Sequence, residues 1–188
     1  MDNNAIIITS INNVRHLINN SILMLRDLDA ALSKHGFQPL NGNALATESS
    51  KHIHQSMEQN ATFFPQYIAR QYALESEIDA NQVNKILFTN IQFYHGAYEE
   101  ITPTMVNSVM IFPNAIENVK NYIQNWWLKY TAFEHTDRKK ISKNGELNEN
   151  IDENGIKTLF WCHNLIDING QNELLREVDQ LVQIFSNN

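Results

Sequence analysis

The chain has little of several residue types, and each shortage excludes a class of structure. Its 188 residues include a single cysteine, Cys162, so an intramolecular disulfide and a cysteine-rich zinc cluster are both excluded. No stretch approaches the roughly 20 apolar residues that a bilayer span needs. The first residues, MDNNAIIITS, lack the basic start of a secretion signal. These absences predict a cytoplasmic protein without a membrane segment.

Positive charge is also scarce. Fourteen Lys and Arg stand against 21 Asp and Glu, which gives a net charge of −7. Because affinity for nucleic-acid backbones rests largely on Lys and Arg, this balance argues against nucleic acid as a partner. The densest basic stretch, residues 138–143, lies close to Asp137 and Glu146. We interpret it as a solvated loop rather than a nucleic-acid site.

The residues that are present suffice for one domain. Hydrophobic residues make up 43% of the chain and aromatic residues 10%. A domain of this size buries roughly 70% of the surface that its unfolded chain exposes. We therefore expect a single α+β domain over residues 1–188, in which residues 1–82 are mainly helical and residues 83–188 contain the sheet.

A long amphipathic helix is predicted near the N-terminus. Its aliphatic residues recur at spacings of three and four: Val14, Leu17, Ile18, Ile22, Leu25, Leu28 and Leu32. Ser10 is the expected N-cap, while Gly36 and Pro39 end the helix. We interpret residues 5–9, which include three consecutive isoleucines, as a short strand before it.

Two shorter helices are expected before the sheet. Residues 47–59 follow a capping threonine, and residues 65–79 begin with a proline, which the first turn of a helix tolerates. Residues 37–45 between the helices carry an Asn-Gly pair typical of a turn.

The second half of the chain favours strands. Residues 85–95 and 104–112 are rich in β-branched and aromatic side chains and predict an antiparallel hairpin. Residues 157–168 are almost continuously apolar, which indicates a central strand. Helical spacing returns over residues 114–130 and 171–185.

The polar residues 135–155 form either a protruding hairpin or a mobile loop, as long connections in compact domains usually do. The whole order predicts an antiparallel or mixed sheet of about three to five strands, packed with four to five helices that include the long N-terminal one. Regular strand–helix alternation, which dinucleotide-binding folds require, is missing.

The fragment ESSKHIHQ, residues 48–55, suggests a metal site. Whether its histidines can bind one ion depends on whether the segment is helical or extended. In a helix, His52 and His54 point about 200° apart and cannot share one ion, and only Glu48 with His52 has the right spacing. In an extended segment the two histidines share a face, with His35 or Glu48 as a third ligand and His95 as a further one. We favour surface histidines and keep the metal site as the alternative.

No catalytic residue or cofactor is assigned. Cys162 and His163 are neighbours in a predicted strand and therefore point to opposite faces, so they cannot act as a pair. Glycine-rich phosphate loops and the HExxH motif are both missing from the sequence.

Aromatic residues provide the binding candidates. One candidate is the segment in which the cation Arg70 stands between the aromatic residues Tyr67 and Tyr72. The other is the pair Trp126 and Trp127, whose side chains would point about 100° apart on a helix. One of the two indoles is therefore expected at a boundary or a partner surface. Partial burial of both at junctions between elements is the alternative.

These features predict a non-catalytic binding or protein-interaction domain. A protein partner or self-association as a homodimer is expected first, and a small-molecule ligand second. The alternative is a metal-assisted hydrolase or nuclease that uses His35, Glu48, His52, His54 and His95.

Overall fold

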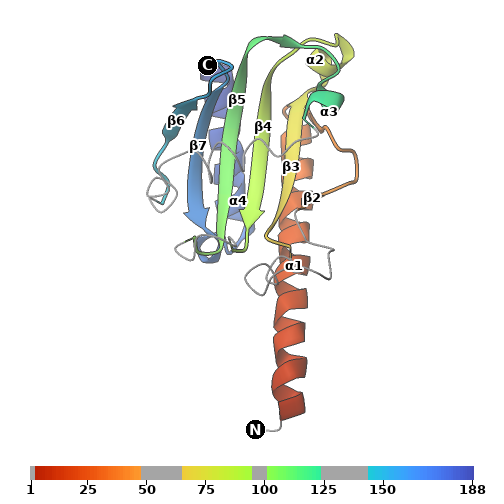
Figure 1. Ribbon diagram of the computed structural model, residues 1–188, viewed down its shortest axis with the longest axis vertical. Coiled ribbons are helices and arrows are strands. Elements are labelled where there is room, and N and C mark those ends of the chain that lie inside the picture. The colour runs from red at the N-terminus through yellow and green to blue at the C-terminus, as the bar shows by residue number, and fades with distance from the viewer. Residues whose placement is uncertain (1–2, 48–64, 95–100, 124–143) are drawn as a thin grey trace.

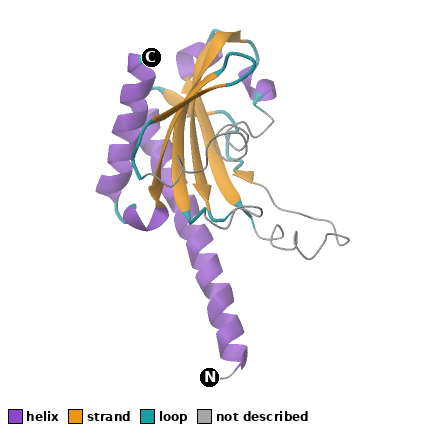
Figure 2. Ribbon diagram, turned by 60° about the vertical axis from the view of Figure 1, so that its left-hand side comes forward, coloured by secondary structure: helices purple, strands orange, loops and turns teal. Residues whose placement is uncertain are grey.

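A computed structural model of the chain describes residues 3–47, 65–94, 101–123 and 144–188. These form a seven-stranded antiparallel sheet, with two long helices on one face (Figures 1 and 2). The α-helices are α1 (Asn3–Ser33), α2 (Glu75–Asp79), α3 (Val119–Tyr122) and α4 (Gln171–Asn187). The strands are β1 (Phe37–Pro39), β2 (Ala46–Thr47), β3 (Tyr67–Leu74), β4 (Val83–Gln92), β5 (Thr104–Ile116), β6 (Asn148–Ile151) and β7 (Lys157–Asn164).

The predicted α+β class and the antiparallel sheet are confirmed. The described residues contain four α-helices, within the predicted range, but seven strands rather than three to five. Strand order is β1-β3-β4-β5-β7-β6, and β2 also pairs with β3. The predicted hairpin is the β4–β5 pair, in which Gln92 lies opposite Thr104 and Lys85 opposite Ile111.

Helix α1 begins at Asn3, so the short strand predicted at residues 5–9 is wrong. Only the second half of α1 packs on the sheet, through side chains such as Leu25, Leu28 and Leu32, each at most 1% exposed. Residues 3–16 are all exposed. Figure 1 shows this half of the helix extending well beyond the sheet, with the N-terminus at its far end.

The helix predicted over residues 65–79 is wrong up to Leu74, because residues 67–74 form β3. Both faces of this strand are buried, so its apolar residues do not alternate with polar ones. Only residues 75–79 are helical. With β1 and β2, β3 places three strands in the part of the chain that we expected to be mainly helical.

Three other predictions change in detail. Residues 157–164 form β7, but β7 lies beside the edge strand β6 and is not central. The strand β5 continues to Ile116, so the helix predicted over 114–130 is reduced in the described residues to α3. Residues 148–151 form β6, within the stretch predicted to be a hairpin or a loop.

One other prediction lies mostly outside the described residues. Thr47, the predicted cap of the 47–59 helix, lies in β2, and the rest of that range lies outside the described residues. The closing helix, by contrast, is confirmed as α4.

The sheet has a hydrophobic core on each face. The core beneath α1 and α4 includes Leu28, Trp161 and Leu181, and the opposite core includes Phe88 and Phe160. None of the described helices combines the length and the apolar character that a membrane span requires.

Candidate functional site

The projecting half of α1 carries exposed aliphatic side chains. Ile7 is 57% exposed, Ile11 is 53% exposed and Val14 is 39% exposed. Ile6 and Ile8 beside them are 48% and 59% exposed. Large aliphatic side chains gathered on one exposed element mark a contact surface more often than an ordinary surface.

Three of these side chains follow a heptad pattern that the partly buried Ile18 continues. Ile7, Ile11, Val14 and Ile18 are separated by four, three and four residues, and we call this set the α1 stripe. The same 4-3 spacing continues through Ser21 into Leu25, Leu28 and Leu32, which are buried against the sheet. The α1 stripe therefore continues a packing surface beyond the point where the sheet ends.

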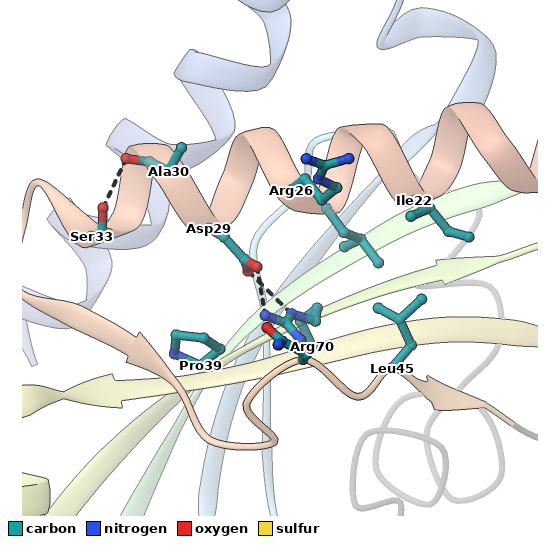
Figure 3. Close-up of a pocket in the computed structure, with 10 residues that line it drawn as sticks. Ile22, Arg26, Asp29, Ala30, Ser33, Pro39, Leu45 and Arg70 are labelled. Carbon is teal, nitrogen blue, oxygen red and sulfur yellow. Dashed lines mark hydrogen bonds and ion pairs between the residues drawn. The ribbon is translucent and has the colours of Figure 1, made fainter.

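A groove lies between α1 and the segment that follows it. Its volume is about 620 Å³, and α1 provides Ile22, Leu25, Arg26 and Asp29 on one side. Figure 3 shows Pro39, Leu45 and Arg70 facing these residues from the other side. Ile22 also lies one helical turn beyond Ile18, so the groove begins where the α1 stripe ends.

Arg70 forms the polar wall of this groove. Its Nε donates to Asp29 Oδ1 at 3.1 Å and its Nη2 donates to Asp29 Oδ2, as the dashed lines in Figure 3 show. Its Nη1 donates to the carbonyls of Gly42 and Ala44 at 2.7 and 3.0 Å. The arginine side chain is 5% exposed. It joins α1, β3 and the loop before β2.

The aromatic residues predicted with Arg70 separate across the sheet. Tyr72 lies on the α1 side, where its hydroxyl donates to Asp29 at 2.8 Å. Burial, and then the neighbouring Asp29 carboxylate, raise the pKa of Tyr72 well above its usual value. Tyr67 belongs to the core on the opposite face. The structure thus joins Arg70 and Tyr72 around Asp29 but does not bring Tyr67 to them.

A second polar cluster lies between α4 and the sheet, around Glu177. Its Oε2 accepts hydrogen bonds from Asn107 Nδ2 and Trp161 Nε1, both at 2.8 Å. Its Oε1 lies 3.2 Å from His163 Nε2. Asn107 in turn accepts a bond from the hydroxyl of Thr89 at 2.7 Å. This network positions α4 on strands β4, β5 and β7.

Cys162 and His163 point to opposite faces of β7, as the strand geometry predicts. Cys162 is buried in the core away from the helices, and burial raises the pKa of its thiol to about 12. His163 lies on the other face and contacts Glu177. The two side chains therefore do not form a nucleophile and its base.

The metal hypothesis falls largely outside the part of the chain that the structure describes. Glu48, His52, His54 and His95 lie outside it, and His35 lies in the exposed turn after α1. Within the described ranges, no three His, Cys, Asp or Glu residues converge as metal ligands would. Trp126, Trp127 and the basic stretch 138–143 also lie outside the described residues.

The α1 stripe was missed in the sequence, although the signal for it was present. Ile7 and Ile11 precede Val14 at the same spacing that defines the rest of the helix. Three consecutive isoleucines favour a strand by propensity, which concealed the longer period.

Comparisons with known proteins found no match from which a function could be inferred. No protein-family model matches the chain, and no curated protein or solved structure matches it.

Proposed function

We propose that this chain is a protein-interaction domain without catalytic chemistry of its own, and that the α1 stripe is its contact surface. The observation that carries the proposal is the half-exposed state of Ile7, Ile11 and Val14 on a helix that extends away from the sheet. A protein partner that covers these side chains would remove apolar surface from water and so be bound.

The composition of the projecting half supports this proposal. Of residues 3–16, only Ala5 and Arg15 are strong helix formers, whereas most of the others are Ile, Asn, Thr, Ser or Val. An isolated helix of about this length is marginal in water even when its residues favour helix. Contact with a partner along the α1 stripe supplies the packing energy that the local sequence lacks.

The groove beneath α1 extends the same surface. Its residue Ile22 follows Ile18 of the α1 stripe by one helical turn, and Leu45 lines the other side of the groove. Arg70 is already held by Asp29 and by two carbonyls. Arg70 and Tyr72 thus support the proposed surface by fixing α1 on the sheet rather than by contacting the partner themselves.

Site-specific photocrosslinking tests the proposal. A photoreactive amino acid is placed at Ile11, on the stripe, or at His16, on the opposite side of the helix. In a lysate of the cells that produce the protein, we expect heavier crosslinked species from position 11 and few from position 16. The double variant Ile7→Asp with Val14→Asp should suppress the crosslinks from position 11.

The matched control places the same two charges on another side of the same helix. Asn13→Asp with Asn20→Asp changes the net charge by the same amount and should leave the crosslinks from position 11 intact. Equal crosslinking from positions 11 and 16, or crosslinks that survive the stripe variant, would contradict the proposal.

A further inference from the structure

We infer that the partner covering the α1 stripe is a second copy of this chain, and that the two α1 helices pack antiparallel. This inference rests on the proposed function and names the partner of the same surface. It follows from three properties of α1: the repeat of its apolar residues, the scarcity of charged residues around them, and the side of the helix on which the sheet lies.

The repeat makes the α1 stripe complementary to itself. Side chains that recur at alternating spacings of three and four pack as knobs into the holes of an equivalent helix. Ionisable groups are few here, since residues 3–22 contain only Arg15 and His16, and His16 lies opposite the stripe. Neither like-charge repulsion between copies nor a charge pattern suited to a different partner is present.

The position of the sheet decides the direction of the second helix. Leu25, Leu28 and Leu32 face the sheet, and a heptad stripe drifts by only about 20° per heptad on a straight helix. The exposed stripe therefore points to nearly the same side of α1 as the sheet. A partner helix seated on it lies in line with the sheet, below it in the view of Figure 1.

A parallel partner is excluded by this placement. Beyond residue 18, a parallel second helix would run into the space that the first copy's sheet occupies. An antiparallel partner avoids the collision, because its N-terminus approaches that sheet while its own sheet lies beyond Asn3 of the first copy. Two-fold symmetry then makes the contact identical for both copies.

The length of the projecting segment selects the register. In the register that we infer, Ile7 lies opposite Ile18 of the partner subunit and Ile11 lies opposite Val14 of the partner subunit. Each pair of facing residue numbers then adds up to 25. In the same register Asn4 of one copy reaches the level of Ser21 of the partner subunit, so the contact ends there. Ser21 is 2% exposed and marks where packing on the sheet begins.

The resulting contact is small. It involves about two heptads from each copy, which is less than a standard stable interface provides. We expect a dimer that forms at micromolar concentration and dissociates on dilution, and whose α1 helicity rises as it forms.

Disulfide trapping tests both the partner and the direction. A mixture of Ile7→Cys and Ile18→Cys chains should yield a disulfide-linked dimer on mild oxidation, because the antiparallel register places these positions opposite each other. Either variant alone should not, since two copies of position 7 lie eleven residues apart along the axis, or about 16 Å. The buried native Cys162 does not interfere.

The outcomes separate this inference from the proposed function. A disulfide in the Ile7→Cys variant alone would show parallel packing and overturn the inference. Monomers at every concentration in sedimentation, with no disulfide in the mixture, would also overturn it. Crosslinks from Ile11 to a different protein would still support the proposed function in either case. Circular dichroism confirms that each variant is folded.

Discussion

Arg70 on β3 and Asp29 on α1 form a two-point ion pair that joins the long helix to the sheet. Both oxygens of the carboxylate accept from the guanidinium, and Oδ1 also accepts from Tyr72. Asp29 is 29% exposed whereas Arg70 is 5% exposed. Loss of the two partners should therefore have unequal costs. Without Asp29 the guanidinium of Arg70 would be a buried charge without a counter-charge, whereas without Arg70 the carboxylate of Asp29 would still contact water.

Asp29→Ala should lower the free energy of unfolding by about 3 kcal/mol, because it leaves the Arg70 guanidinium buried without its counter-charge. Urea denaturation measures the change. The control Asp27→Ala removes an exposed carboxylate two residues away on α1 and should change stability by no more than about 0.5 kcal/mol. Equal effects of the two substitutions would show that the ion pair does not hold α1 in place.

Glu177→Ala should destabilise the chain by about 3 kcal/mol. The substitution leaves the buried donors of Trp161 and Asn107 without an acceptor, and each such loss costs about 1–3 kcal/mol. Trp161 is one of three tryptophans, so the difference between wild type and variant in fluorescence and near-ultraviolet circular dichroism reports the change around it. Asp179→Ala, on the exposed side of α4, is the control and should leave both signals unchanged.

The thiol of Cys162 should not react while the chain is folded. Its pKa is raised to about 12 by burial, so the reactive thiolate is almost absent at pH 8. We expect labelling by a disulfide reagent only in denaturant. Fast labelling of the native protein at pH 8 would show that the core around β7 opens readily.

The same pKa predicts a loss of stability in alkali. In the unfolded chain a thiol ionises near roughly pH 8.5, so the contribution of Cys162 to stability is complete below that pH. It falls as the pH rises toward the folded-state pKa of about 12. Between pH 8 and 10, the wild type should lose about 2 kcal/mol more than Cys162→Ala does.

Removal of residues 3–16 should leave the fold intact. All fourteen of these residues are exposed, so the stability of the monomer should change by less than about 1 kcal/mol. Removal of residues 3–28 also deletes the buried Leu25 and Leu28 and should prevent folding. If the shorter truncation also unfolds the chain, residues 3–16 make stabilising contacts within their own molecule.

Elements with a clear helical period or a strongly β-favouring composition were predicted correctly, and elements without either signal were not. The closing helix has a clear helical period, and the strands of the β4–β5 hairpin are rich in β-branched and aromatic residues, so both were predicted although β4 and β5 are buried on both faces. β3 failed because burial on both faces removes the alternation, and because its Ala, Arg, Gln and Leu residues favour helix. β7 also has a continuous run of apolar residues. Such a run indicates that a strand is buried but does not indicate that it lies at the centre of the sheet.

The polar clusters around Asp29 and Glu177 could not be predicted from the sequence. Asn107 and Glu177 are 70 residues apart, and Asp29 and Arg70 are 41 apart. Only the register of the sheet and the seating of α1 and α4 bring these side chains together. The α1 stripe could have been predicted, because its spacing is local, but its exposure depends on where the sheet ends.

Both edges of the sheet end in very short strands. β1 spans three residues and includes Pro39, which has no N–H to donate, and β6 spans four residues. Such edges offer little backbone to an incoming strand. Growth into a fibril by strand addition is therefore disfavoured at both ends, and concentrated chains should remain as finite assemblies rather than polymerise.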